Sequence, residues 1–426
     1  MTARLRHGPC AGGSVLATLL LAFALSAFAP SVRAASDASE ATALRVSLIT
    51  FGPGNVYWER FGHNALLIEN RDTGAAIAYN YGIFDFSQKN FFLNFARGYM
   101  QYRIAADRWS DDLAWYLQTG RSITQQRLNL SPAQSLELAR FLQWNARPEN
   151  ASYRYDYFLS NCSTRVRDAL DRVLGGALER QLAARPAALG HTWRFDAVRA
   201  LSPDTALAMA MDIALGPRAD RPLNLWQESF LPDELSRALT TVQVTDTSGQ
   251  TTPLVAETRV LSPGRITPLP KQPPNWLPPL LGTGLGLALI LLALRAARAA
   301  RMARIVFATL ATGLSLGFGL LGIGHLLIWA ATQHWAGWAN ENLLFFNPLC
   351  LLLIPAWLAA GRRSWAPVWQ NRVLAVLILA MAATALALHQ VPAVAQDNLA
   401  WVALALPVHA ALAVCLWRAT RRPFHH

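Results

Sequence analysis

Residues 153–168 read YRYDYFLSNCSTRVRD, and this stretch decides how the soluble part of the chain is organised. From Cys162 onward, apolar residues recur at helical spacing at positions 166, 169, 170, 173 and 174. The pair Gly175-Gly176 then ends the run, as a helix C-terminus would. Ser160 or Asn161 is the natural N-cap. The pattern predicts a helix that begins at Cys162.

Cys162 is the only cysteine in the part of the chain that we expect to be soluble. The other three lie in an N-terminal export signal and in apolar segments: Cys10, Cys350 and Cys415. An unpaired cysteine in an oxidising compartment suggests a reactive thiol. In the first turn of a helix, unpaired N–H groups and the helix dipole favour the thiolate, and Arg165 and Arg167 add positive charge. We expect a nucleophile; the alternative is a buried structural cysteine.

Residues 1–35 have the features of a secretory signal peptide. Positive charge at Arg4 and Arg6 precedes a short apolar core, and Val32-Arg33-Ala34 resembles a cleavage site. The alternative is an uncleaved membrane anchor. Hydrophobic residues make up 53% of the chain and charged residues only 15%, which is low for a soluble protein. The net charge of +12 does not indicate nucleic acid, because the arginines of the C-terminal half cluster beside apolar spans.

We expect four parts: the signal peptide, a periplasmic Cys/His domain over 36–260, a proline-rich linker over 261–275 and a transmembrane domain over 276–426. Five apolar stretches approach the length of about 20 residues that spans a bilayer. They cover 276–294, 305–331, 343–360, 373–389 and 399–417. Arginines follow the first, third and fifth stretches, so the positive-inside rule places the soluble domain in the periplasm and the C-terminus in the cytoplasm. This predicts a multi-pass protein of the inner (cytoplasmic) membrane.

His63 is the candidate general base. Residues 44–51, 66–68 and 75–81 are predicted strands, with a hairpin turn at 71–74. His63 therefore stands at the head of a strand, where a base can be aimed at a thiol carried by a helix. The alternative is a structural histidine. Asn80, late in the next strand, is a candidate for orienting the His63 ring, or else a turn residue.

Two capping boxes and one polar loop complete the pattern. Asp85 to Gln88 is predicted to cap a helix through Phe95, and Ser131 to Gln134 a helix through Trp144. The loop HWAGWANENLLFFNP at 334–348 carries polar groups at the membrane surface, which bind a lipid headgroup or support the catalytic domain; the alternative is an ordinary interfacial loop. The candidate substrate-binding residues are Glu59, Asn161, Arg165, His334, Asn340 and Asn342.

Three motifs carry a resemblance to a known family. WERFGH at 58–63, YNYGIFDF at 79–86 and NCSTR at 161–165 resemble the Lnb-type lipoprotein N-acyltransferase family, whose members have an exported domain followed by membrane spans. The family's catalytic Cys and His fall on Cys162 and His63. The order of His before Cys is that of a circularly permuted papain-like fold, as in the lecithin–retinol acyltransferases and, unpermuted, the NlpC peptidases. The resemblance implies an α+β domain followed by a C-terminal α-helical membrane domain of about five spans.

The resemblance also implies an activity. It predicts a cysteine-dependent acyltransferase that takes an acyl chain from a phospholipid, holds it as a Cys162 thioester, and passes it to the N-terminal amine of a diacylated lipoprotein. A cysteine amidase or peptidase acting on cell-wall peptides is the first alternative, and a non-enzymatic envelope assembly or binding protein the second. We expect no cofactor and no metal, because the sequence has neither a metal-ligand motif nor a phosphate loop.

Overall fold

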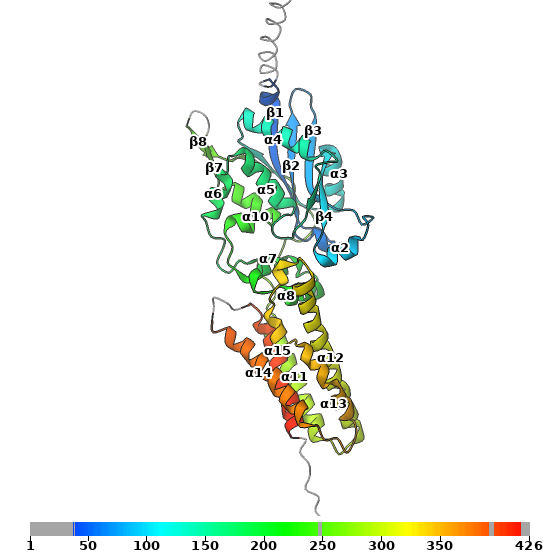
Figure 1. Ribbon diagram of the computed structural model, residues 1–426. Coiled ribbons are helices and arrows are strands. Elements are labelled where there is room, and N and C mark those ends of the chain that lie inside the picture. The colour runs from blue at the N-terminus through cyan, green and yellow to red at the C-terminus, as the bar shows by residue number, and fades with distance from the viewer. Residues whose placement is uncertain (1–36, 38, 246–248, 392–395, 419–426) are drawn as a thin grey trace, which may run out of the picture.

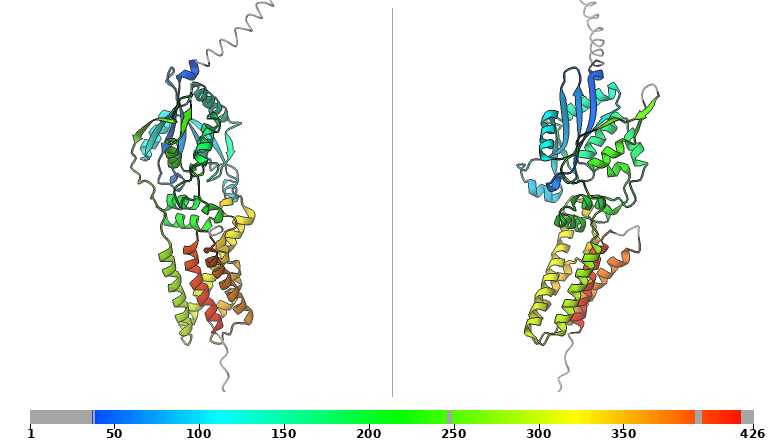
Figure 2. Two further views of the ribbon diagram at one scale, coloured as in Figure 1. Left: turned by 90° about the vertical axis from the view of Figure 1, so that its left-hand side faces the viewer. Right: turned by 180° about the vertical axis from the view of Figure 1, so that it is seen from behind.

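The computed structural model describes residues 37–418 except 38, 246–248 and 392–395. The predicted signal peptide at 1–35 lies outside the described residues. The described chain forms a mixed domain of strands and helices that stands on the end of a helical bundle (Figures 1 and 2). The fold is therefore the predicted combination of an α+β domain and a C-terminal membrane domain.

The upper domain is built on an antiparallel sheet of seven strands in the order β6-β4-β3-β2-β1-β5-β9. These strands are β1 Leu44–Phe51, β2 His63–Asn70, β3 Ala76–Ile83, β4 Gln101–Arg108, β5 Ile123–Leu128, β6 Ser152–Arg154 and β9 Val255–Ser262. Phe51 pairs with His63 and Ala65 pairs with Asn80, so His63 and Asn80 lie on adjacent strands. The predicted start of a strand at Leu44 and its end at Phe51 are confirmed.

Helices cover both faces of this sheet. Three of them share one core with apolar sheet residues such as Leu48 and Leu66: α4 Pro132–Asn145, α5 Cys162–Val173 and α10 Pro232–Leu239. On the other face, α3 Trp109–Thr119 packs through Leu113 and Tyr116 against Phe51 and Ala65. Successive residues of a strand point to opposite faces, so His63 shares the α3 face with Ala65, whereas Asn64 shares the α5 face with Leu66.

One predicted cap is confirmed and one is wrong. Ser131 and Gln134 form the capping box of α4. The helix after Asp85 begins only at Phe91, as α2 Phe91–Arg97, and Asn90 precedes it in a left-handed conformation with φ of 60°. Asp85 instead accepts a hydrogen bond from the Ser87 N–H at 2.8 Å, which closes a local turn. A short polar side chain can stabilise either structure, and here the turn is the one formed.

The rest of the upper domain lies beside and below the sheet. Its elements are η1 Tyr57–Glu59, α6 Ala177–Ala183, α7 Trp193–Leu201, α8 Thr205–Ala214, η2 Pro217–Asp220, α9 Leu225–Glu228, β7 Gln243–Thr245 and β8 Thr251–Pro253. Of these, α7 and α8 lie between the sheet and the bundle (Figure 1). A segment rich in proline connects β9 to the first helix of the bundle.

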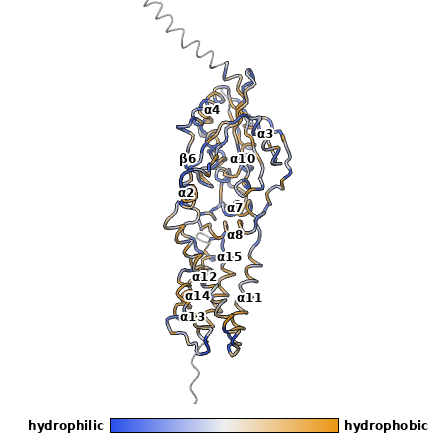
Figure 3. The backbone as a smooth tube through the Cα atoms, turned by 90° about the vertical axis from the view of Figure 1, so that its right-hand side faces the viewer, coloured by the Kyte–Doolittle hydropathy of each residue, from blue (hydrophilic) through white to orange (hydrophobic). Residues whose placement is uncertain are grey.

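The bundle contains four helices that are long and apolar enough to cross a membrane: α11 Leu277–Ala296, α12 Arg301–Ala331, α14 Trp369–Leu388 and α15 Leu399–Trp417. Hydrophobic residues dominate along their length, and hydrophilic residues mark the far ends (Figure 3). The arginines of these far ends include Arg295, Arg304 and Arg372, so the charge pattern behind the predicted orientation lies at the end away from the sheet domain.

The third predicted span is present but broken. It is a bent pair of segments, Trp335–Leu344 and Pro348–Ala359, that meet at an angle of 40°. The first contains η3 Trp335–Gly337 and η4 Glu341–Leu344, and the second contains η5 Pro348–Leu353 and α13 Ile354–Ala359. Pro348 lacks an N–H, and the Asn347 side chain caps the N–H of Leu349 instead. The segment still traverses the bundle, because Gly361 beyond it accepts a hydrogen bond from Arg304 at the far end. It passes so close to α12 that a Cβ on Gly322 would lie 2.4 Å from the Phe346 carbonyl oxygen.

Candidate active site

The start of α5 is fixed directly onto β2. The Ser163 hydroxyl donates a hydrogen bond to Asn64 Oδ1 at 2.8 Å, and a second interaction joins the same hydroxyl to the Ser229 carbonyl at 2.7 Å. Asn64 in turn donates to the Thr50 hydroxyl on β1 at 2.9 Å. All these groups are buried. Since Ser163 follows Cys162 and Asn64 follows His63, this network sets the position of the one candidate residue relative to the other.

Asn161 is the N-cap of α5, which confirms one of the two predicted N-caps, Ser160 or Asn161. Its Oδ1 accepts from the backbone N–H groups of Ser163 and Thr164, both at 2.9 Å. Its Nδ2 donates to the carbonyl groups of Tyr157 and Phe230. The side chain is buried and each of its polar atoms is engaged, so these contacts position the helix start and give no support to substrate binding by this residue.

The imidazole of His63 is held by Asn80 and by two aromatic rings. His63 Nε2 lies 3.0 Å from Asn80 Oδ1, a carbonyl oxygen that can only accept, so the ring proton is on Nε2 and Nδ1 is free to act as a base. Asn80 Nδ2 donates to Asp112 at 2.8 Å, which fixes the amide in this orientation. The ring stacks on Phe51 and on Tyr116.

Cys162 lies at the end of the sheet, against Gly82 of β3. A Cβ on Gly82, whose φ is +91°, would lie 3.4 Å from the Cys162 Cβ. Cys162 is partly exposed and is a free cysteine within the part of the chain that the structure describes. Among the described residues it makes no hydrogen bond with His63, and such contacts between catalytic groups often tighten only when substrate binds. Gly82, which lies within the motif at 79–86, and Asn64, which directly follows the motif at 58–63, were not predicted as part of the site.

Burial acts against the predicted thiolate. Burial lowers the pKa of His63 to about 4. Burial also raises the pKa of the Cys162 thiol, and this outweighs the hydrogen bonds from the backbone of Asn64 and Ser163 and the charge of Arg121, which lower it. The first-turn position therefore favours the thiolate less than desolvation opposes it. Burial thus favours the neutral form of both groups.

Arg121 is the cation that acts on this pair, and the sequence did not single it out. It is only 2% exposed, its Nε donates to the Gly52 carbonyl at 2.7 Å, and its guanidinium lies over the Tyr116 ring. Its Nη2 has no hydrogen-bond partner in the described part of the chain. Positive charge here lowers the pKa of both His63 and Cys162. The residues next to Arg121 in the sequence gave no indication that it lies near His63 and Cys162.

Glu59 and Arg165 are the two remaining candidate substrate-binding residues of the upper domain. Glu59 lies against Gly54 in the turn before β2, and its charge acts on Arg121 and Tyr116. Arg165 donates to the Ser160 hydroxyl at 3.1 Å, and its guanidinium lies over the Tyr153 ring. Neither contact shows a substrate-binding position, so both residues stay as predictions.

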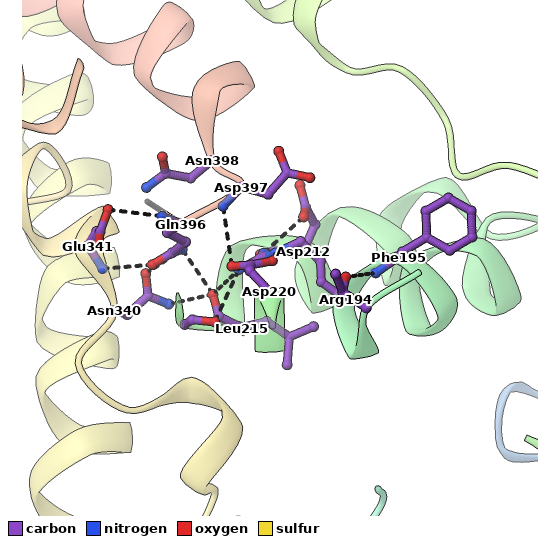
Figure 4. Close-up of polar contacts among 12 residues, drawn as sticks. Arg194, Phe195, Asp212, Leu215, Asp220, Asn340, Glu341, Gln396, Asp397 and Asn398 are labelled. Carbon is purple, nitrogen blue, oxygen red and sulfur yellow. Dashed lines mark hydrogen bonds and ion pairs between the residues drawn. The ribbon is translucent and has the colours of Figure 1, made fainter. Parts of the chain in front are cut away.

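The polar residues of the 334–348 loop join the two domains (Figure 4). The Asn340 amide donates to the carbonyl groups of Ile213, Ala214 and Leu215, and the Asn342 amide to that of Ile213. These carbonyls end α8, where a helix leaves its last acceptors unpaired. Both side chains are buried. Their contacts support the predicted alternative of bracing the catalytic domain and give none to headgroup binding.

Further contacts complete this junction. Gln396 donates to Leu215 and Asn340, Asn398 donates to Asn342, and Trp401 donates to Asp212. Asp212 and Asp220 hold the buried guanidinium of Arg194. His334 lies apart from this network, with Nε2 3.0 Å from the Phe95 carbonyl oxygen and its ring stacked on Tyr157. We call the network of Arg194, Asp212, Asp220, Asn340, Asn342, Gln396 and Asn398 the domain junction.

Two other features of the described residues are separate from this site. His191, Asp196 and Glu228 bring together groups that could hold a metal ion, which their separation in sequence had concealed. His191 Nδ1 already contacts a Glu228 carboxylate oxygen at 2.5 Å, and one oxygen of Asp196 already pairs with Arg199. A surface hollow beside α4, lined by residues such as Phe141 and Trp144, contains none of the candidate residues.

Comparison with known proteins identifies both parts of the chain. Residues 32–203 match the family model of the Lnb N-terminal periplasmic domain, and residues 272–420 match that of the Lnb transmembrane domain. Together the two matches cover most of the chain. No curated protein and no solved structure matches it significantly. The first match includes His63, Asn80 and Cys162, and the second includes all the membrane segments.

Proposed function

Because the chain belongs to the Lnb family, with a periplasmic domain followed by a membrane domain, we propose that it is a cysteine-dependent acyltransferase of the inner membrane. The proposed donor is a phospholipid, the intermediate is a thioester on Cys162, and the acceptor is the N-terminal amine of a diacylated lipoprotein. The proposed catalytic residues are Cys162 as nucleophile, His63 as base and Asn80 as the residue that orients His63.

One observation carries this proposal. The residues that directly follow His63 and Cys162 are joined by the 2.8 Å hydrogen bond between Asn64 and Ser163, so the strand and the helix meet at the two candidate residues. The Nε2 of His63 is occupied by Asn80, which leaves Nδ1 for the thiol. A nucleophile, a base and a residue that orients the base are the three parts of a cysteine acyl-transfer site.

The first half-reaction is acylation of Cys162. His63 Nδ1 takes the thiol proton as the sulfur attacks the ester carbonyl of the donor, and a C–S bond forms. Asn161 caps the N–H groups of Ser163 and Thr164, which leaves the N–H of Cys162 to stabilise the oxyanion. The C–O bond then breaks, and the lysophospholipid leaves with the proton from His63. A neutral resting pair suits this step, because a neutral imidazole is the form that accepts a proton.

The second half-reaction returns the free thiol. The acceptor amine attacks the thioester carbonyl, His63 takes a proton from the attacking nitrogen, and the C–S bond breaks as the amide forms. The proton passes from His63 to the departing sulfur. The long apolar helices hold the periplasmic domain at the membrane, where both the donor and a lipid-anchored acceptor reside. In the proposed orientation the arginine-rich ends and the C-terminus face the cytoplasm.

The proposal is tested by intact-protein mass spectrometry. The purified protein is incubated in detergent with a phospholipid of defined acyl chain, beside Cys162→Ala and a Cys350→Ala/Cys415→Ala control, in which both other described cysteines are removed. We expect an acyl-sized mass increase, removed by hydroxylamine, in the parent and the control but not in Cys162→Ala. An adduct that persists in Cys162→Ala contradicts the assignment of the nucleophile. No adduct, together with cleavage of murein peptides by the protein, supports a peptidase instead.

A further inference from the structure

An exposed aromatic surface lies at the lower edge of the periplasmic domain, around α2. Its members, which we call the aromatic surface, are Tyr57, Trp58, Phe84, Phe86, Phe91 and Phe92. Phe92 is 74% exposed, and Tyr57, Trp58 and Phe86 are each exposed by 44% or more. A contiguous patch of large apolar side chains is rare on a soluble domain and marks a binding surface for a protein, a ligand or a membrane.

The aromatic surface leads to the candidate nucleophile. Phe84, at its inner edge, contacts Trp58 and Tyr102, and Tyr102 stacks on Tyr155. Phe84 follows Gly82 by two residues, and Gly82 lies against Cys162. Burial and, after it, the nearby Cys162 raise the pKa of the Tyr155 hydroxyl. Aromatic side chains therefore continue from the exposed face of α2 to the immediate surroundings of the sulfur.

The other end of the aromatic surface reaches the membrane domain. Phe95, the next ring on α2, contacts Tyr157, which stacks on His334. The Gln333 N–H donates to the Arg97 carbonyl at 2.8 Å, and Gly98 packs against Gln333. Gln333 comes two residues after the end of α12 at Ala331. Figure 1 shows α2 beside the upper end of α12, so the helix that carries these rings lies at the end of the bundle nearest the sheet domain.

Positive charge accompanies the exposed rings. Lys89 and Arg97 flank the aromatic residues of α2, and both residues are exposed. Neither Lys89 nor Arg97 makes a salt bridge among the described residues. Asp85 is the one acidic residue in the described segment 84–97. Basic groups beside aromatic rings suit a molecule with an anionic headgroup and apolar chains.

Resting on the proposed function, we infer that the aromatic surface is the binding site through which a phospholipid of the outer leaflet reaches Cys162. The exposed rings of α2 and of the Tyr57-Trp58 turn contact its acyl chains, and Lys89 and Arg97 contact its phosphate. The occupant is one lipid of the surrounding leaflet, because the surface is continuous with the outer end of α12 and ends at the nucleophile. The site therefore selects a donor that lies in a membrane over one dissolved in water.

The test compares two donors in one pair of variants. Phe86→Ser/Phe92→Ser removes two exposed rings, and Trp144→Ser/Leu189→Ser is the control, since Trp144 matches Phe86 in exposed fraction at 50% and both its residues lie outside the aromatic surface. Acyl-enzyme formation is timed with a long-chain phospholipid in nanodiscs and with a short-chain phospholipid kept monomeric in water. We expect Phe86→Ser/Phe92→Ser to slow acylation from the nanodisc at least about tenfold, with the rate from the monomeric donor unchanged.

Two results would overturn the inference. An equal loss with both donors means that the rings support the fold of the site, and no loss with either donor means that the lipid enters elsewhere. A second measurement does not depend on the reaction: a phospholipid with a photoreactive acyl chain in nanodiscs is expected to cross-link to the peptide containing residues 84–97 of Cys162→Ala. Failure of all acylation in the parent protein, with this cross-link present, refutes the proposed function and leaves the binding surface in place.

Discussion

The candidate active site and the domain junction are both buried and polar, but they differ in how their polar atoms are paired. At the junction the amides of Asn340 and Asn342 donate to the last carbonyls of α8, and Gln396 and Asn398 donate to those two side chains in turn. At the site, within the described part of the chain, Arg121 Nη2 has no partner and Cys162 makes no hydrogen bond to His63.

This difference separates structure from chemistry. A buried polar atom without a partner costs about 1–3 kcal/mol, so a fold keeps such atoms only where something else requires them. The junction satisfies its amides and fixes the periplasmic domain on the bundle. The site keeps a neutral thiol, a free imidazole nitrogen and an unpaired guanidinium N–H together, which are groups that a reacting ester can use. Substitutions at the two regions should therefore separate loss of rate from loss of stability.

The largest expected effect comes from His63→Ala. Without a base at this position the thiol proton has no acceptor, and the raised pKa of Cys162 leaves little thiolate near neutral pH. We expect the rate of acyl-enzyme formation to fall about 10²–10⁴-fold, with the temperature of unfolding nearly unchanged. The rate is followed by rapid quenching and mass spectrometry. Asn129→Ala serves as the control, because Asn129 follows the end of β5 that lies away from Phe51 and His63. A rate within a few-fold of the parent protein would remove His63 from the site.

The parts of the site that the sequence predicted are those set by local pattern. Asn161 could be identified as a cap because a polar residue stood directly before an amphipathic run, and Asn80 because its strand was predicted beside that of His63. Arg121 lacked such a signal, since its position depends on contacts with the Tyr116 ring and with the carbonyl of Gly52, directly after β1. The helix dipole was the only influence on the Cys162 pKa that the sequence showed, whereas the burial that raises this pKa depends on the complete packing.

The bundle and the junction also contain features that the sequence pattern could not predict. The length and hydropathy of its apolar stretches predicted five spans, whereas the structure has four long apolar helices and the third stretch is broken at Asn347-Pro348. The polar side chains at 340 and 342 were visible as unusual, but their partners lie more than a hundred residues away in α8. Sequence pattern locates such groups at a membrane surface and cannot show which backbone carbonyls they reach.

A smaller effect, on pH dependence, is expected from Arg121→Gln. The positive charge of Arg121 lowers the pKa of the Cys162 thiol, so its removal raises that pKa and reduces the thiolate fraction at any given pH. The same charge lowers the pKa of His63, so the imidazole pKa rises from about 4 toward its ordinary value. We expect the pH profile of Cys162 alkylation by iodoacetamide to shift to higher pH and acylation at neutral pH to slow several-fold.

Arg121→Lys distinguishes charge from packing in this experiment. Lysine keeps the positive charge but loses the fork that donates to Gly52 and stacks over Tyr116. If Arg121 acts through its charge, Arg121→Lys retains most of the parent pH profile, while Arg121→Gln shifts it. If both variants lower the temperature of unfolding equally and leave the profile in place, the residue is structural and the electrostatic comparison between the two regions fails.

The smallest effect on rate is expected at the junction, from Asn342→Ala. The change removes one of the two amide donors to the Ile213 carbonyl, the other being Asn340, and deprives Asn398 of its acceptor, in a place that is fully buried. We expect the free energy of unfolding to fall by about 1–3 kcal/mol, while acylation by a water-soluble donor proceeds at the parent rate. Thermal unfolding in detergent and the acylation assay are measured together, with Asn371→Ala at the far end of the bundle as control. A loss of rate without a loss of stability would mean that Asn342 acts on substrate, as one of the two interpretations of its loop had predicted.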